Sequence, residues 1–190
     1  MNALFALFRS FDLRDVVGTS AVVSWGPILA GRACVALLIV AHPCSHGGPD
    51  NIRQTFSANV TLRDWATTFM PQFEACVESG GLGMMCSFNA IRGVPACANH
   101  RAMVTWAKKQ WEFPGYIVSD QGAAWGIYSK TGHAFAKTVE EAAAYAVRGG
   151  LDLEDTDTPA DSVLHHGLPG AVAQGLLSKG DIDQSVSRLM

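Results

Sequence analysis

Asp120 is the carboxylate in this sequence that is best placed to do chemistry. It directly follows Tyr116–Ser119, a short apolar run that the pattern predicts to be a buried strand entered through Pro114 and Gly115. Side chains at the carboxyl ends of strands line the ligand sites of α/β proteins, so an aspartate there can bind or attack a substrate. The alternative is that Asp120 only caps a helix beginning near Gly122, and spacing alone does not decide between the two roles.

Predicted strands and helices alternate on both sides of Asp120. Short apolar runs between glycines or polar loops indicate buried strands at 84–88, 116–119 and 151–153. Apolar residues at helical spacing predict helices at 62–79, 101–110, 139–148, 169–177 and 182–189. Strands and helices that alternate in this order form right-handed βαβ units, so the sequence predicts an α/β fold on a parallel sheet.

The predicted helices have recognisable ends. An N-cap residue followed three positions later by an acidic residue or glutamine satisfies backbone amides that the first turn leaves free. The pairs with this spacing are Thr61 with Asp64, Thr138 with Glu141, and Asp181 with Gln184. The helix that starts after Thr138 is predicted to end at Gly149–Gly150, because glycine adopts the left-handed conformation that often closes a helix.

Residues 1–43 are the least readable part of the chain, because glycine and proline interrupt every candidate element. The apolar run Ala33–Ala41 predicts a buried strand. It is far shorter than the roughly 20 residues of a membrane-spanning helix, and Arg32 directly precedes it. His46–Asn51 has the composition of a turn. The first residues lack the basic start and the cleavage site of a signal peptide, so they do not predict export, and the localisation stays open.

Composition indicates a folded domain with no electrostatic surface for a polyanion. Hydrophobic residues make up 48% of the 190 residues and charged residues 16%, which is typical of a globular protein. The formal net charge of -3, without runs of like charge, argues against nucleic acid or a membrane as a partner. The five cysteines lack the C-x-x-C spacing of zinc and redox motifs, and their odd number leaves the compartment undecided.

Several motifs, in a fixed order, resemble those of glycoside hydrolase family 3. They are HGGPDN, MCSFN, GVPACANHRAMVTWAKKQWEFPGYIVSDQGA, KTVEEAAAYAVRGGLDLE and GLLSKGDIDQSVSRL. The sequence looks most like the β-xylosidase and β-glucosidase branch, whose catalytic domain is a TIM-like (β/α)8 barrel followed by an α/β sandwich domain. A complete barrel needs about 250 residues. The resemblance therefore implies that 44–190 is a partial barrel, roughly the C-terminal half, and that 1–43 is an unassigned and aberrant segment.

The resemblance implies a retaining exo-β-glycosidase in which Asp120 is the catalytic nucleophile. Its carboxylate would attack the anomeric carbon, form a glycosyl-enzyme intermediate and stabilise the oxocarbenium-like transition state. The substrate would be a β-linked oligosaccharide or glycoside cleaved at its terminal non-reducing sugar, without a cofactor or a metal. The residues that choose between xylose, glucose and arabinose lie in loops that are absent or do not align.

The resemblance also assigns two positions to sugar binding in the terminal subsite. Arg53 corresponds to an arginine that binds the sugar, although it could be an ordinary surface arginine. His42 corresponds to the histidine of a Lys-His pair, but Ala41 stands where the lysine would be. His42 could therefore be a loop histidine with no ligand.

Three apolar residues near the nucleophile are further candidates. Phe88 stands where family members often have a tyrosine, so that hydroxyl contact is lost. Met85 and Phe88 either contact the sugar or only pack the barrel interior. Trp125 either stacks on the apolar face of a pyranose or packs in the core.

No residue of the chain is identified as the general acid. A retaining enzyme needs a second carboxylic acid about 5 Å from the nucleophile, and in the family that acid comes from beyond the barrel. A missing sandwich domain or a partner chain would have to supply it. Two other readings stay open: a noncatalytic relic or carbohydrate-binding fragment, and an α/β protein in which Asp120 is only a helix cap. An incomplete barrel also predicts low stability, because its strand edges are unpaired.

Overall fold

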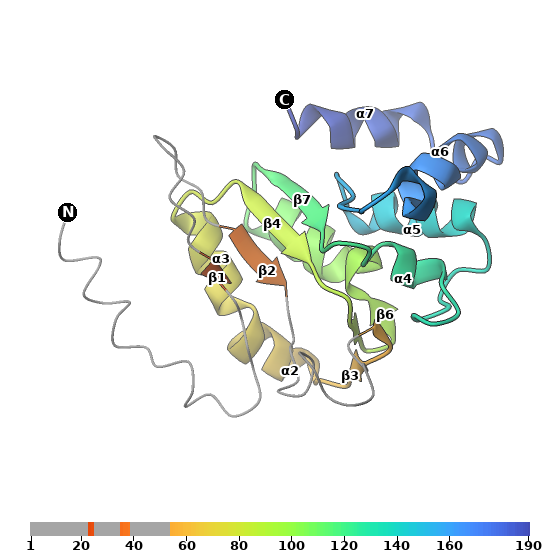
Figure 1. Cartoon of the computed structure of the whole chain (residues 1–190). Coiled ribbons are helices and arrows are strands. Elements are labelled where there is room, and N and C mark those ends of the chain that lie inside the picture. Colours follow the sequence, from red (N-terminus) through yellow and green to blue (C-terminus); the bar gives the residue numbers. More distant parts are fainter. Residues whose placement is uncertain (1–22, 25–34, 39–53) are drawn as a thin grey trace.

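A four-stranded sheet forms the centre of the computed structural model (Figure 1). The structure describes residues 54–190 and the backbone of two strands nearer the N-terminus, β1 (Val23–Ser24) and β2 (Val35–Leu38). The strand order is β1, β2, β4 (Gly83–Cys86) and β7 (Tyr116–Ser119). β1 is antiparallel to β2, whereas β2, β4 and β7 are parallel. The predicted α/β fold on a parallel sheet is therefore confirmed.

The strand predicted at 151–153 is reduced to a single bridge. Leu153 pairs with Val118 of β7 as an isolated parallel bridge. The backbone amides of Asp152 and Leu153 both donate to the carbonyl of Ile117, at 2.8 and 3.1 Å, so the regular ladder does not extend.

Part of the sequence prediction lies outside the described residues. This applies to the turn at 46–51 and to the candidate sugar-binding residues His42 and Arg53. β2 falls within the strand expected at 33–41. Its side chains are not described, so its burial stays a prediction.

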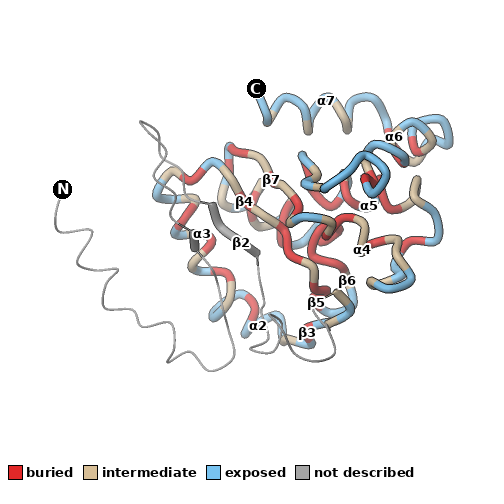
Figure 2. The backbone as a smooth tube through the Cα atoms, viewed as in Figure 1, coloured by how far each residue is buried: buried red, intermediate tan, exposed pale blue. Residues whose placement is uncertain are grey.

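β4 and β7 bury one face of the sheet. Met84 and Cys86 of β4, and Ile117 and Ser119 of β7, are buried, and the residues between them are half-buried. Successive side chains of a strand point to opposite faces, so this alternation means that one face packs more tightly than the other. Figure 2 shows buried residues in β4 and β7 and in the helical segments of the described part of the chain.

The first predicted helix is formed by three consecutive pieces. Thr61 caps α2 (Leu62–Asp64) by accepting a hydrogen bond from the backbone amide of Asp64, as predicted. A π-helical turn, Trp65–Phe69, leads into α3 (Pro71–Glu78). Proline has no N–H to donate and a fixed φ, so it is tolerated at the first position of a helix and marks the break here.

Two helical segments flank β7 in the chain. The helix predicted at 101–110 is present as the π-helical segment Arg101–Gln110. The short α4 (Trp125–Tyr128) follows β7. The shorter 3-10 turns are Ala96–Ala98 and Pro159–Asp161. Within the described part of the chain, no helix has the length and apolar character needed to cross a membrane.

α5 (Val139–Gly149) begins and ends at the predicted residues. The Thr138 hydroxyl accepts a hydrogen bond from the backbone amide of Glu141, and the Glu141 carboxylate accepts one from the amide of Lys137. Gly150 has φ 109°, a left-handed conformation that favours glycine.

α6 (Val163–Ala173) starts earlier than predicted, so Pro169 lies inside the helix rather than at its beginning. Ser162 is the N-cap of α6, and its hydroxyl accepts a hydrogen bond from the amide of His165 at 2.9 Å. The Glu154 carboxylate also accepts hydrogen bonds from the first two backbone amides of α6, at 2.9 and 2.8 Å. The positive end of the helix dipole favours a carboxylate at this place. The helix therefore starts at a serine cap that a distant carboxylate reinforces, and not at the proline.

The prediction that Asp181 caps the last helix is wrong, because Ser178 is the N-cap of α7 (Lys179–Ser187). The Ser178 hydroxyl accepts a hydrogen bond from the amide of Asp181, and the Asp181 carboxylate accepts one from the amide of Ser178. Hydrogen bonds from the Ser178 backbone and hydroxyl hold the pKa of Asp181 below its usual value.

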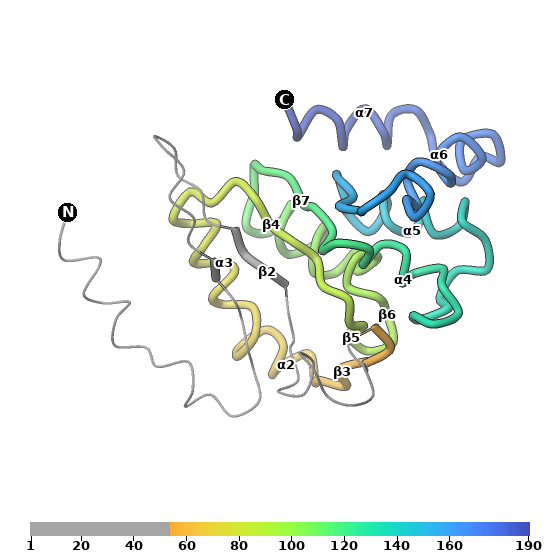
Figure 3. The backbone as a smooth tube through the Cα atoms, viewed as in Figure 1, coloured from red at the N-terminus to blue at the C-terminus, as the bar shows by residue number. Residues whose placement is uncertain are grey.

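A second, small sheet lies beyond the carboxyl end of β4 (Figure 3). β3 (Ser57–Ala58) is parallel to β5 (Ala90–Ile91), and β5 is antiparallel to β6 (Val94–Pro95). The segment that connects β4 to this sheet contains Phe88. One end of that segment is therefore held by β4 in the central sheet and the other by β5 in the small sheet.

Gly167 allows the close approach of α6 to α5, so Gly167→Ala should destabilise the fold. An added Cβ would lie 2.4 Å from the Val139 carbonyl oxygen and 2.7 Å from the Ala143 Cβ. We expect the free energy of unfolding to fall by about 1–3 kcal/mol in a urea titration. Gly180→Ala is the matched control, because its nearest neighbour would be 3.5 Å away and alanine favours helix. Equal midpoints for the two variants would contradict the tight contact.

Candidate active site

Asp120 is half-buried at the carboxyl end of β7. Its backbone amide donates to the Cys86 carbonyl at 2.8 Å, which places it beside the end of β4. Its Oδ1 accepts a hydrogen bond from the amide of Gln121 at 2.8 Å. α4 begins only at Trp125, with Ala124 as its N-cap. The Asp120 side chain therefore does not cap a helix, and the helix-cap interpretation is wrong.

Leu153 and Asp155 hold the backbone on both sides of Asp120. The Ser119 amide donates to the Leu153 carbonyl at 3.0 Å, and the Asp155 amide donates to the buried Ser119 hydroxyl at 2.9 Å. The Gly122 amide donates to the Asp155 carbonyl at 2.9 Å. Gly122 has φ 74°, so glycine is favoured at this turn. The main chain of Asp120 is thus preorganised, as a reacting group requires.

A cavity of about 320 Å³ lies next to this turn. That volume is at the lower end of the range of small-molecule sites, about 300–1,000 Å³. Two aromatic residues, Phe88 and Trp125, line it together with amide, hydroxyl and carboxylate groups. The lining residues are Gln54, Phe88, Gln121, Gly122, Trp125, Thr156, Asp157 and Asp161. Aromatic surface beside hydrogen-bonding groups suits a neutral ring that carries hydroxyls.

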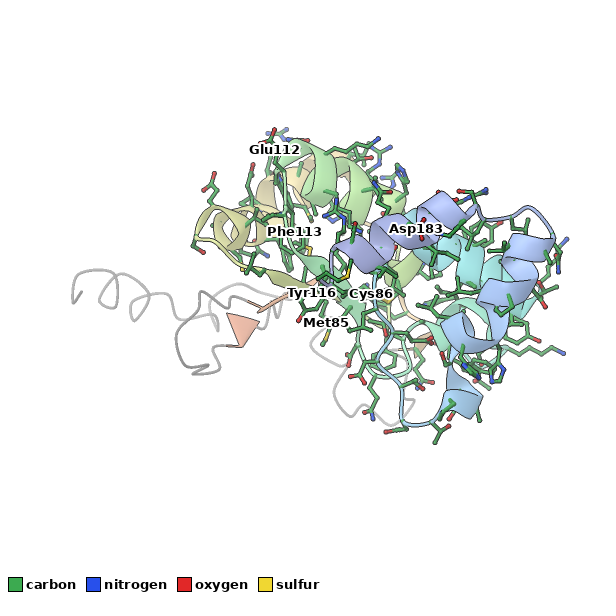
Figure 4. The ribbon with its side chains drawn as sticks, turned by 90° about the horizontal axis from the view of Figure 1, so that it is seen from above. Met85, Cys86, Glu112, Phe113, Tyr116 and Asp183 are labelled. Carbon is green, nitrogen blue, oxygen red and sulfur yellow. A yellow bond between two sulfur atoms is a disulfide. The ribbon has the colours of Figure 1, made fainter. Side chains whose placement is uncertain are left out.

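The structure brings only some of the predicted site residues together. Phe88 and Trp125 line the same cavity as Gln121 and Gly122, the two residues that follow Asp120. Met85 is half-buried on β4, in register with Val118 of β7, and is not among the cavity residues (Figure 4). The proposed contacts of Phe88, Trp125 and Met85 with a ligand stay predictions.

Sequence reasoning missed the polar side of the cavity. The Gln121 amide nitrogen donates to the Asp157 carboxylate, which joins the turn after β7 to the loop before α6. Asp157 and Asp161 belong to no recognised motif, so the sequence contained no signal for them. Gln121 could have been noticed because it directly follows Asp120.

A disulfide between Cys86 and Cys97 closes the segment that carries Phe88. The cysteines are 11 residues apart, with a Cα–Cα distance of 5.1 Å. Both are buried. Within this segment, the Ser87 hydroxyl donates to the Asn89 side-chain oxygen at 2.7 Å. The disulfide thus restrains the segment that carries Phe88, one of the aromatic residues lining the cavity.

Replacing Cys86 and Cys97 together with alanine should lower the free energy of unfolding by about 2–3 kcal/mol, because the unfolded chain loses a constraint on its entropy. Urea unfolding of the wild-type and double-variant chains measures the difference. Alkylation under denaturing, non-reducing conditions is the companion assay. It should leave both cysteines of the wild-type chain unmodified, and modification of either would contradict the pairing.

The model of the glycosyl hydrolase family 3 N terminal domain matches residues 39–190. A β-xylosidase/α-L-arabinofuranosidase of Medicago sativa subsp. varia is 39% identical over 136 residues, which cover 71% of this chain and 17% of that protein. The β-D-xylosidase 3 of Arabidopsis thaliana is 38% identical over the same length and with the same coverage. The chain thus spans about one sixth of the length of these relatives.

Solved structures show the same likeness in three dimensions. A family 3 exo-β-xylosidase in complex with a xylobiose aziridine activity-based probe superposes with a TM-score of 0.65 and 26% identity, over 72% of this chain and 17% of that one. A β-glucosidase from Listeria innocua superposes with a TM-score of 0.63 and 29% identity, over 70% of this chain and 17% of that one. These neighbours have a TIM-barrel N-terminal domain, and the chain corresponds to part of that barrel, as predicted.

Proposed function

The chain belongs to glycosyl hydrolase family 3, and from this premise we propose that it is part of a retaining exo-β-glycosidase with Asp120 as the nucleophile. Its substrate is a β-linked glycoside with a terminal xylose or glucose, cleaved at the non-reducing end. The observation that carries the proposal is the position of Asp120, half-buried at the carboxyl end of β7 and one residue before the wall of an aromatic-lined cavity.

The proposed reaction has two steps that use the same carboxylate. An oxygen of Asp120 forms a bond to the anomeric carbon while the bond to the leaving oxygen breaks, and the leaving group takes the electron pair. Water then attacks the anomeric carbon and gives one proton to the second carboxyl group, now acting as a base, while the bond to Asp120 breaks and its oxygen keeps the electron pair. Backbone hydrogen bonds around Asp120 support this role, because they hold the attacking group in place without neutralising it.

Protonation of the leaving oxygen needs a second carboxylic acid that we assign to a different segment or chain. Glu141 and Glu154 are engaged as helix caps of α5 and α6. We therefore propose that a sandwich domain or a partner chain supplies the acid. Xylosides and glucosides with a good leaving group need little of this assistance.

Covalent trapping tests the nucleophile without depending on the acid. The chain is incubated with dinitrophenyl 2-deoxy-2-fluoro-β-D-xyloside or the matching glucoside, alone and with a homologous sandwich domain, and adducts are mapped by peptide mass spectrometry. An adduct on the peptide that contains Asp120 supports the proposal, and the preferred probe identifies the sugar. Folded chain that takes up no label under either condition contradicts the proposal, and saturable sugar binding by that chain would identify a carbohydrate-binding fragment instead.

A further inference from the structure

His133 connects the two aromatic sides of the cavity beside Asp120. Its Nε2 lies 2.7 Å from the backbone carbonyl oxygen of Phe88. A carbonyl oxygen can only accept, so Nε2 carries a proton and donates it. The backbone amide of His133 donates to the carbonyl of Gly126 at 2.8 Å, and Gly126 directly follows Trp125.

The segment that carries His133 is itself fixed against α4. The amides of Phe135 and Ala136 both donate to the Ile127 carbonyl, at 2.9 and 3.0 Å. At Gly132 the approach is so close that an added Cβ would lie 2.7 Å from the Gly126 carbonyl oxygen. His133 therefore projects from a segment that has little freedom to move relative to Trp125.

A smaller space of about 50 Å³ separates this segment from the aromatic residues. Phe88 and Trp125 line it, as they line the larger cavity, and Gly132 closes it from the side of the His133 segment. His133 is not among the residues that line this space, but its hydrogen bond holds Phe88, which is one of them. Losing that bond would leave the separation of the two rings less well defined.

We propose that His133 is a positioning residue that sets the spacing of Phe88 and Trp125 and thereby the affinity of the cavity for a sugar ring. The inference rests on the proposed function only in taking the ligand to be a sugar. His133 does not line the larger cavity, so it acts through Phe88 and not on the reacting atoms. It therefore affects sugar binding rather than the chemical step at Asp120.

Two substitutions of His133 distinguish the effect of its hydrogen bond from the effect of its side-chain volume. His133→Leu removes the donor, whereas His133→Gln places an amide donor at a similar reach. Calorimetry measures the affinity for methyl β-D-xyloside and methyl β-D-glucoside. The labelling assay, run at several concentrations of the 2-fluoro-glycoside, gives separately the constant for reversible binding of that probe and the rate constant of labelling. We expect about three- to tenfold weaker binding for His133→Leu, an unchanged rate constant, and affinity within about twofold of wild type for His133→Gln. His165→Leu, an exposed histidine on α6, is the control.

A double-mutant cycle tests whether Phe88 transmits the effect. In the background of Phe88→Ala, His133→Leu should cause no further loss of affinity, because the aromatic ring whose position depends on His133 is gone. A loss that persists in that background, or failure of His133→Gln to restore binding in a chain of normal stability, would overturn the proposal.

Amide hydrogen exchange measures, in the absence of sugar, how firmly His133 holds the segment that contains Phe88. His133→Leu should raise exchange in the peptide that contains Phe88 by about three- to tenfold and leave α7 unchanged. Unchanged exchange in that peptide would overturn the inference even if the chain binds sugar. Raised exchange in a chain that neither binds sugar nor takes up label would contradict the proposed function and the sugar-affinity role, and leave His133 with a structural role only.

Discussion

Asp120→Asn should abolish covalent labelling by the 2-fluoro-glycoside, with a fall in the labelling rate of at least about 10⁴-fold. The amide has nearly the same size as the carboxylate and can still accept a hydrogen bond from the Gln121 amide, so the turn after β7 should persist. It is a poor nucleophile and bears no charge to stabilise the developing oxocarbenium ion. The loss should therefore occur without loss of the fold, and intact-protein mass spectrometry over time measures it.

Asp183→Asn is the matched control for this substitution. Asp183 lies on α7 (Figure 4) and is not among the residues that line the cavity beside Asp120. It pairs with Lys179 at 2.6 Å on an exposed surface. Such exposed pairs contribute little, so labelling should stay within about twofold of wild type. Labelling of Asp120→Asn at the wild-type rate would show that another residue carries the adduct and would remove Asp120 from the mechanism.

Much of the local structure around Asp120 could be predicted because its causes lie close together in the chain. Tyr116–Ser119 is a short apolar run after proline and glycine, and it is β7 at the predicted bounds. The Thr138 cap and the glycine that ends α5 are also local signals, and both were found. Asp181 shows the limit of such signals, since Ser178 three residues earlier offers a competing cap and is the one used.

The cavity beside Asp120 could not be predicted, because contacts between distant residues form it. Asp157 meets Gln121 across 36 positions, and His133 meets Phe88 across 45. Neither pair has a spacing rule that periodicity or capping could reveal. Glu154 is a similar case. Its carboxylate accepts hydrogen bonds from two backbone amides of α6 that lie nine and ten positions later in the chain. Family resemblance led to the proposal that Asp120 is the nucleophile, but only the fold shows which groups surround that residue.

The ion pair of Lys108 and Asp152 is another such long-range contact, and breaking it should have the largest effect on stability. The Lys108 ammonium lies 2.7 and 2.8 Å from the two carboxylate oxygens of Asp152 and donates to the Gly150 carbonyl at 2.7 Å. The two side chains are only 10% and 1% exposed. Asp152 also accepts a hydrogen bond from the amide of Ile117 in β7 at 2.9 Å. The pair thus connects the Arg101–Gln110 helix to β7, the strand that directly precedes Asp120.

Lys108→Met should lower the free energy of unfolding by about 3–5 kcal/mol, because it leaves the Asp152 carboxylate buried without its counter-charge. Urea unfolding at neutral pH measures the loss. Lys109→Met, at the exposed neighbouring position, is the control and should change stability by about 0.5 kcal/mol or less. Lys108→Met combined with Asp152→Asn should be more stable than Lys108→Met alone, since the unpaired charge is removed.

The pH dependence of the same variants separates the charge of Lys108 from its packing. Burial lowers the pKa of Lys108 below its usual value of 10.5, and the hydrogen bond to Asp152 opposes this only in part. Between the lowered pKa and 10.5 the unfolded chain binds more protons than the folded one, so this group makes stability rise with pH in that window and no further above it. The stability of wild type relative to Lys108→Met should therefore increase as the pH approaches 10.5. A difference that is flat or falls over this window would show that the ion pair, rather than desolvation, dominates the energetics of the lysine.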